Sequence, residues 1–546
     1  MKNTAANSIA QAVVMLVGFF VLPLLIRGFG VAAYGTYVLA VSVSSWAGLL
    51  DLGLPATVVR RVAAAQAVGA LGQLRATLRS AGVLYAALGL ALTAVVAGLA
   101  FAAGAIFRVT PGEALTLRWL LLLTAGAQLL LWPTALCRDA LSGLQRYDLV
   151  SALVIVGAVV DVAGVAVVLA SGRGPVLLVA IRLFGQALVF AMGALFVLRV
   201  GAAGEGCARG GTRVAGAERT AVATAERTAV AERTAAATAE RTATTTTMAA
   251  TTAVSTSPAA LLREARPQFI LQVSGLLSKQ QTAKLIVGII LGTAAATLFD
   301  VAAKFNSLLS TFSSLSTSAA TPVIAELNAL ERHDSLRALL ISGSRAVTAL
   351  VTPVTCVLLL LTGPLIRTWL GPSFAAAIPI TLLLLSAQAA VPLYQMGDPV
   401  LIGKNRLRRW ARSAVCIALL NLALAWLGVR LFGAVGAGLA ALICGAIELP
   451  WYMLIVRRET GVSLRRWLAA GIWPAIPLLA LPILLCLLAR LTPLTDSLPG
   501  LVTVAATAIA AYWLVFWRVG LKGWERSLLW NSLRHGSDSA ENGQHG

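Results

Sequence analysis

The 546-residue chain is 58% hydrophobic and only 12% charged, and its mean hydropathy is +0.85. Soluble proteins carry about 25% charged residues, so this composition excludes an ordinary soluble protein and indicates one that crosses a membrane many times. The formal net charge of +21 is compatible with binding of nucleic acid or of anionic lipid, and only the positions of the basic residues distinguish the two.

Long apolar runs follow one another along the chain, each close to the roughly 20 residues that a transmembrane helix needs. We predict spans at about residues 8–26, 36–56, 81–107, 117–137, 149–170, 175–198, 268–292, 297–325, 341–362, 376–400, 411–429, 433–456, 468–489 and 498–517. These uniformly apolar runs do not alternate as barrel strands do, and only helices or closed barrels satisfy their backbone in lipid. We therefore predict an all-α polytopic membrane protein with about 14 transmembrane helices.

The basic residues alternate from one side of the membrane to the other. With the N-terminus placed inside, 32 of the 43 lysines and arginines fall in inner segments and seven in outer loops. This asymmetry follows the positive-inside rule and predicts a multi-pass protein with both termini in the cytoplasm. The surplus of positive charge is then a topology signal beside anionic lipid, and nucleic acid is not an expected partner.

A stretch of different composition separates span six from span seven. It repeats Ala-Glu-Arg-Thr at 217–220, 225–228, 231–234 and 239–242, and it has too few bulky apolar residues to form a core. We therefore divide the chain into an N-terminal lobe (1–200, about six helices), a low-complexity cytoplasmic insert (201–258), a C-terminal part (259–520, about eight helices) and a cytoplasmic tail (521–546).

The candidate functional residues are charged side chains that fall inside predicted spans. An ionised group at the bilayer centre costs about 2.5 kcal/mol or more, so such residues face a polar interior and are functional by default. The cations are Arg182, Lys279, Lys284 and Lys304, and the anions are Asp161 and Asp300. This leaves a surplus of two positive charges, which requires a bound anion, water or a shifted pKa.

Spacing suggests several pairings among these groups. Asp300 and Lys304 are four residues apart on one helix and could pair along it. If spans seven and eight are neighbours, Lys284 also lies near Asp300, and Asp161 could pair with Arg182 across spans five and six. Internal salt bridges of this kind are the structural alternative to a binding role, whereas Lys279 has no evident partner in the sequence. The helix after Lys304 is unusually rich in serine and threonine.

Signals for metal, cofactor or enzyme chemistry are poor. The six cysteines and three histidines show no ligand spacing, so neither a metal site nor a cofactor is predicted. No nucleophile motif, phosphate-binding loop or outward-facing carboxylate pair is present. We expect a transporter and not an enzyme, although a polytopic ligase or polymerase is a remaining alternative.

Short motifs in a fixed order resemble those of polysaccharide (lipid-linked oligosaccharide) flippases, which belong to the multidrug/oligosaccharidyl-lipid/polysaccharide exporter superfamily. The motifs are Leu22-Pro-Leu-Leu-Ile-Arg-Gly-Phe-Gly30, Tyr34-Gly-Thr-Tyr37, Leu50-Asp-Leu-Gly-Leu54, Arg60-Arg-Val-Ala63, Leu141-Ser-Gly-Leu-Gln-Arg-Tyr-Asp148, Pro322-Val-Ile-Ala-Glu-Leu327, Pro364-Leu-Ile-Arg-Thr-Trp-Leu-Gly371 and Gly397-Asp-Pro-Val-Leu-Ile-Gly-Lys-Asn-Arg406. The resemblance covers nearly the whole chain except the 201–258 insert, which departs from the family pattern, and the tail.

The resemblance implies two helical lobes around a central cavity, in a bacterial inner membrane. It implies that undecaprenyl-diphosphate-linked oligosaccharide moves from the inner to the outer leaflet by alternating access, for lipopolysaccharide or exopolysaccharide biosynthesis. The partners would be the polyprenyl-diphosphate-linked glycan, membrane lipid, and polymerase or glycosyltransferase machinery.

Buried cations suit a diphosphate, so we expect Arg182, Lys279, Lys284 and Lys304 to bind it, with Asp161 and Asp300 tuning the charge or coupling an ion. The alternatives are an ion-coupled small-molecule exporter of the same fold and a non-transporting envelope scaffold.

Overall fold

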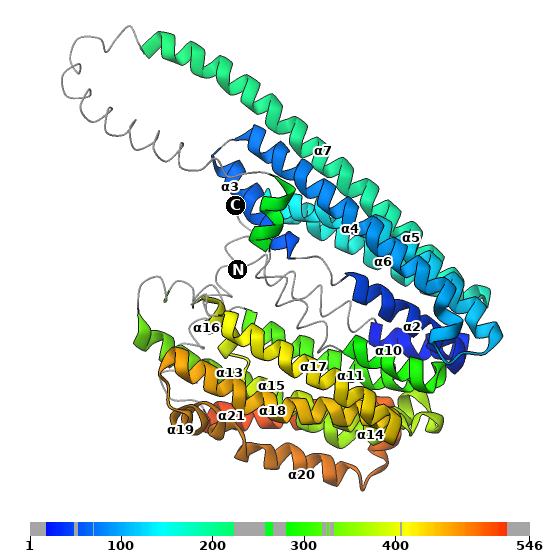
Figure 1. The fold of residues 1–546 in the computed structure, drawn as a ribbon. Helices are drawn as coiled ribbons and strands as arrows, with labels where there is room; N and C mark the ends of the chain where they lie inside the picture. The colour runs from blue at the N-terminus through cyan, green and yellow to red at the C-terminus, as the bar shows by residue number, and fades with distance from the viewer. Residues whose placement is uncertain are drawn as a thin grey trace.

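The computed structural model describes residues 18–48, 53–68, 70–222, 257–265, 280–318, 324, 327, 332–403 and 407–520. All regular structure in these ranges is helical, as the sequence predicts. Two groups of helices are visible in Figure 1, one from each half of the chain.

The N-terminal group packs around α5. Its helices are a first one at Gly18–Phe29, α2 (Val31–Gly48), α3 (Leu54–Ala67), α4 (Leu71–Ile106), α5 (Pro111–Gly143), α6 (Tyr147–Ser171) and α7 (Pro175–Val222). Helices α2, α3, α4 and α7 all lie against α5, and α6 lies mainly against α7. α5 begins with a capping box, in which Thr110 and Glu113 satisfy each other's backbone N–H groups.

The C-terminal group begins with a tight helical hairpin, α10 (Gln280–Leu291) and α11 (Thr293–Ser318), joined through Gly292. The other helices are α13 (His333–Leu370), α14 (Ala377–Ala389), α15 (Val391–Tyr394), α16 (Gly397–Gly403), α17 (Leu407–Phe432), α18 (Ala434–Thr460), α19 (Leu464–Trp467), α20 (Ala480–Ala489) and α21 (Leu498–Val519). Helix α14 packs on α11 and α18, and α13 packs on α21 and α20.

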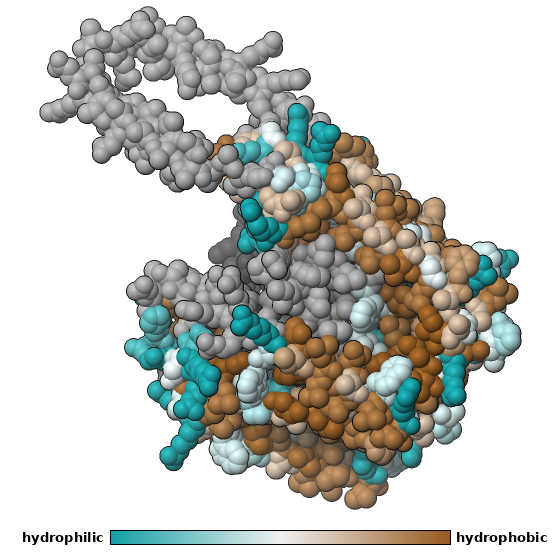
Figure 2. Space-filling view, viewed as in Figure 1, coloured by the Kyte–Doolittle hydropathy of each residue, from teal (hydrophilic) through white to brown (hydrophobic). Residues whose placement is uncertain are grey.

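Ten described helices are long and apolar enough to cross a membrane. They coincide with ten of the predicted spans, and the other four predicted spans overlap the helix Gly18–Phe29, α2, α10 and α11. Hydrophobic surface covers both groups in Figure 2, with hydrophilic residues gathered toward the helix ends. Phe101, Trp119, Ile155, Val159 and Phe184 are among its exposed large side chains. This pattern fits a lipid-facing belt.

Two predicted spans are broken in the structure. The segment predicted at 376–400 forms α14, α15 and α16 in succession. The segment predicted at 468–489 starts as a π-helical turn (Leu468–Ile472) and passes through two 3₁₀ turns before α20 begins. Pro474 and Pro477 lie in those 3₁₀ turns, and each removes a backbone donor and crowds the preceding turn, which explains the interruption.

Helix α7 does not end where span six is predicted to end. Its 48 residues extend about 72 Å at 1.5 Å per residue, more than twice a hydrocarbon core of about 30 Å. The helix therefore continues into the first part of the predicted insert, as far as Val222. Figure 1 shows it projecting well beyond its neighbours.

The helical segment at 258–265, just after the insert, is associated with the N-terminal group. Leu261 and Ala265 are fully buried in the same hydrophobic cluster as residues of α3 and α4. Glu264 accepts hydrogen bonds from Arg60 (3.2 Å) and Arg61 (2.8 Å) of α3. The chain thus contacts the N-terminal group once more before it enters the C-terminal one.

Candidate functional site

Helix α2 lies at the contact between the two groups, against α5 on one side and against α10 and α11 on the other. Two glycines permit this close approach. A Cβ atom on Gly35 would lie 2.2 Å from the backbone oxygen of Thr293, and one on Gly288 would lie 2.2 Å from a methyl group of Leu39. Because α11 and α2 meet at backbone distance, side chains that flank Gly35 reach across to the other group.

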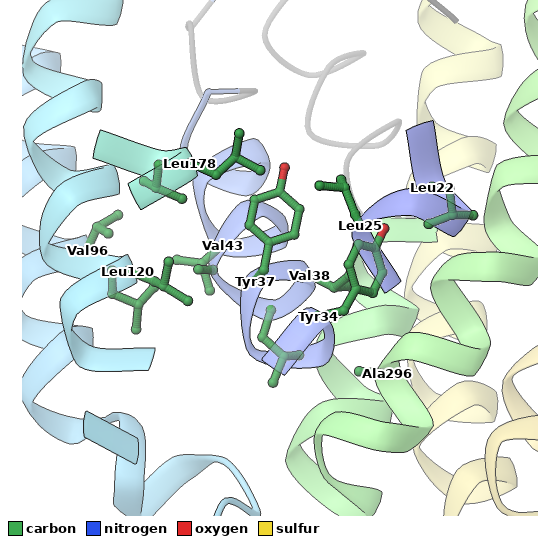
Figure 3. Close-up of a cluster of buried hydrophobic side chains, with 14 of the residues drawn as sticks. Leu22, Leu25, Tyr34, Tyr37, Val38, Val43, Val96, Leu120, Leu178 and Ala296 are labelled. Atoms are coloured by element: carbon green, nitrogen blue, oxygen red, sulfur yellow. The ribbon is translucent and has the colours of Figure 1, made fainter. Parts of the chain in front are cut away.

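Tyr34 and Tyr37 project from the same side of α2, as Figure 3 shows, because residues three apart share a helix face. Their ring centroids are 5.8 Å apart. The hydroxyl of Tyr34 donates to Oδ2 of Asp300 on α11 at 2.8 Å, and this bond is buried. It joins the N-terminal group directly to the C-terminal group.

Asp300 is shared between the two groups. Its second oxygen, Oδ1, lies 2.6 Å from Nζ of Lys284 on α10, and the two side chains are only 4% and 8% exposed. Breaking such a buried pair by removing one partner costs about 3–5 kcal/mol, because the other charge is left uncompensated. The prediction that Lys284 lies near Asp300 is confirmed. Asp300 forms its ion pair with Lys284 and not with Lys304, which lies four residues along the same helix.

A second ion pair lies within the N-terminal group. Nε of Arg182 on α7 is 3.1 Å from Oδ1 of Asp161 on α6, so the predicted pairing across these helices is confirmed. A second nitrogen of the same guanidinium donates to the hydroxyl of Tyr37, and the guanidinium carbon lies 5.6 Å from the centre of the Tyr37 ring. The fork geometry of arginine lets one side chain hold both partners.

Six side chains on five helices therefore form a continuous polar series through the apolar interior: Asp161, Arg182, Tyr37, Tyr34, Asp300 and Lys284. Its two carboxylates and two cations balance each other. The rings of Tyr34 and Tyr37 lie between the two ion pairs, tilted by 46° to each other, and no hydrogen bond joins their hydroxyls within the described residues.

Lys304 lies one helical turn below Asp300 and is half-buried. It makes no ion pair or hydrogen bond in the part of the chain that the structure describes. The same face of α11 changes character at this residue. Thr293, Thr297 and Asp300 are at most 5% exposed, whereas Ser307 and Ser314 are exposed. Lys304 thus lies between the buried part of this helix face and the part where serine side chains are exposed.

Comparison with known proteins finds a family that the chain resembles. Two family models, both described as polysaccharide biosynthesis proteins, match residues 1–211 and 261–379. Over these two stretches the chain is similar to polysaccharide biosynthesis proteins. The stretch that neither model matches, 212–260, overlaps the predicted insert, and no curated protein sequence matches the chain.

Solved structures show which fold the chain has. The lipid II flippase MurJ in an inward closed conformation matches with a TM-score of 0.62 at 13% identity, covering 94% of this chain and 98% of that one. An inward-facing multidrug resistance MATE family transporter of the MOP superfamily matches with a TM-score of 0.60 at 12% identity, covering 83% and 99%. The chain therefore shares the helical membrane fold of these two structures, and its role as a transporter and not an enzyme stays a prediction.

The outcome differs among the predicted site residues. Arg182, Lys284, Asp161 and Asp300 all enter the polar series, and Lys304 lies beside it. Lys279 lies outside the described residues. Whether any of these side chains binds a diphosphate stays a prediction.

Sequence reasoning missed the tyrosines. Tyr34 and Tyr37 stood out only as part of a family motif, because a tyrosine in an apolar helix has no charge to mark it. A tyrosine pair also occurs in the C-terminal group, where Tyr452 donates to Asp398 and Tyr394 to Glu448. Buried carboxylates in this chain are thus repeatedly held by phenolic hydroxyls. The available signal in the sequence was that Tyr34 directly precedes Gly35.

Proposed function

We propose that this protein moves an undecaprenyl-diphosphate-linked oligosaccharide from the inner to the outer leaflet of a bacterial inner membrane, by alternating access, for lipopolysaccharide or exopolysaccharide biosynthesis. The similarity to polysaccharide biosynthesis proteins supports a role in that process, and the likeness to the folds of MurJ and the MATE transporter supports transport. In this proposal both termini are cytoplasmic, and the α10–α11 turn lies at the outer side.

The observation that carries the proposal is Lys304. Its ammonium group is half-buried and unpaired among the described residues, one turn from a neutralised Lys284–Asp300 pair. A cation in an apolar interior is stabilised by an anion, and a diphosphate supplies two adjacent negative groups. The exposed hydroxyls of Ser307 and Ser314 on the same face suit the hydroxyl groups of a sugar.

Arg182 and Lys284 are already paired, so they would contribute to the diphosphate site only by exchanging Asp161 or Asp300 for phosphate oxygens. Lys279 is proposed to add a further cation. Polymerase and glycosyltransferase machinery are the proposed protein partners, because they would supply and consume the glycan carrier.

Complementation of a strain that lacks its own flippase tests this function. We expect Lys304→Gln to reduce surface polysaccharide about tenfold or more at equal protein level, and Lys304→Arg to retain most of it, because arginine keeps the charge. Arg118→Gln is the matched control, since this exposed arginine contacts the ring of Phe101 away from the lobe contact. Full export by Lys304→Gln would contradict the proposal.

The same strain separates the alternatives. A flippase should tolerate deletion of residues 223–256, whereas a scaffold that recruits a partner through the insert should fail. An exporter of small cationic compounds would instead confer drug resistance without restoring polysaccharide.

A further inference from the structure

Several hydrogen bonds join the two groups of helices around the α10–α11 turn. Thr297 donates to the backbone oxygen of Val31 at 2.8 Å, and Thr293 donates to Glu113 at 2.9 Å. Arg108 donates to the backbone oxygen of Ile290 at 3.3 Å. Farther from this turn, Trp46 of α2 donates to the hydroxyl of Thr282 on α10 at 3.1 Å.

The Tyr34–Asp300 bond differs from these in two respects. It is the deepest of them along α11, and its acceptor is a carboxylate that also neutralises Lys284. A hydrogen bond to a charged acceptor is stronger than a neutral one, and its loss leaves a buried carboxylate oxygen without its donor. Any event that draws Asp300 away from Tyr34 therefore weakens the contact between the groups.

We propose that the Tyr34–Asp300 hydrogen bond is a latch that holds the two lobes closed at the α10–α11 end, and that an anion arriving at Lys304 releases it. Lys304 is four residues from Asp300 on the same helix, so an anion held by its ammonium group lies close to the Asp300 carboxylate. Like charges repel, so the bound anion displaces the Asp300 carboxylate from the Tyr34 hydroxyl. Closure at this end then persists until the anionic cargo is in place.

The latch itself does not depend on which molecule is transported, but the anion-release step rests on the proposed function. The reverse order of events follows from the same contacts. Without an anion, Asp300 returns to its position between Lys284 and Tyr34. The α10–α11 end of the interface, which faces away from the side where the cargo is loaded, then closes.

Cysteine accessibility tests the latch in the full-length protein. The six native cysteines are replaced by alanine, and Ala296→Cys introduces one thiol at a position that is 0% exposed on α11 and lies beside α2 in Figure 3. An impermeant maleimide is applied to intact cells, and the labelling rate is measured. We expect Tyr34→Phe to raise this rate about tenfold, the factor that fits loss of a hydrogen bond to a charged acceptor.

Tyr37→Phe is the matched control for this experiment. It makes the same chemical change one turn along α2, but Tyr37 bonds Arg182 inside the N-terminal group. Labelling of the thiol at position 296 should therefore stay within about twofold of the parent, whatever happens to transport. An unchanged rate in Tyr34→Phe, or an equal rise in Tyr37→Phe, would overturn the latch.

A second measurement keeps Tyr34 intact and so remains informative if Tyr34→Phe does not fold. Inorganic pyrophosphate is supplied to the inner face of membrane vesicles, and labelling at position 296 is followed from the opposite face. We expect millimolar pyrophosphate to raise the rate at least threefold, and Lys304→Gln to abolish the rise. No response in the parent overturns the release step. Neither measurement uses a glycolipid, so their failure is distinguishable from a failure of complementation.

Discussion

The two ion pairs of the polar series have the same chemistry but different surroundings. Lys284 and Asp300 are 8% and 4% exposed, whereas Arg182 and Asp161 are 34% and 52% exposed. The first pair is committed to structure, because neither charge can be solvated if its partner leaves. The second pair is less enclosed by other protein groups, so we expect it to exchange partners at lower cost than the first pair. Burial, and not the identity of the charges, separates a structural pair from one available to a ligand.

The largest expected effect comes from removing one partner of the buried pair. Asp300→Ala leaves the Lys284 ammonium uncompensated and should lower the free energy of unfolding by about 3–5 kcal/mol. Thermal unfolding in detergent measures this loss. Asp161→Ala is the comparison, with an expected loss of at most about 1 kcal/mol. Equal losses in the two variants would show that burial does not distinguish the pairs.

A change at the backbone contact of α2 should have an intermediate effect. The Cβ atom of Gly35→Ala would lie 2.2 Å from the Thr293 oxygen, so α2 or α11 must shift, at a cost of about 1–3 kcal/mol. Gly98→Ala on α4 is the control, because nothing lies within 4 Å of its added Cβ atom. The difference in melting temperature between the two variants measures the contact, and a Gly35→Ala protein as stable as Gly98→Ala would argue against close packing here.

The smallest effect is expected at the more exposed pair. Arg182→Lys keeps the charge but cannot hold Asp161 and Tyr37 together, so stability should change by less than about 1 kcal/mol. Transport should fall more than stability if Arg182 exchanges Asp161 for a ligand. A binding assay with a polyprenyl diphosphate, compared with the melting temperature of the same variant, separates the two effects.

Much of the fold could be predicted because hydropathy is a local property. Runs such as 149–170 and 498–517 coincide with α6 and α21, since about 20 apolar residues have few alternatives to a membrane helix. Helix breaks were harder, because prolines are common in membrane helices. Pro353 lies inside an unbroken α13, whereas Pro474 and Pro477 interrupt their segment.

The charged residues of the site could also be found from the sequence, since each is costly in lipid. Their partners were less certain, because Asp300 had a local candidate in Lys304 and a distant one in Lys284. The structure pairs it with Lys284, which α10 presents at the right depth. The contact of Tyr34 with Asp300 bridges 266 residues of sequence, and no spacing rule reaches that far.

The hairpin of α10 and α11 has a mechanical consequence. Only Gly292, with a φ of 93°, separates Leu291 from Thr293, and the two helices pack along their length. Lys284 and Asp300 therefore belong to one rigid hairpin, and the distance between them does not change when the hairpin tilts. The desolvation of this ion pair is completed once, as the protein folds and inserts, and does not recur in each transport cycle. The hydrogen bonds of the hairpin with the other group of helices, that of Tyr34 among them, are the contacts that have to be broken and remade.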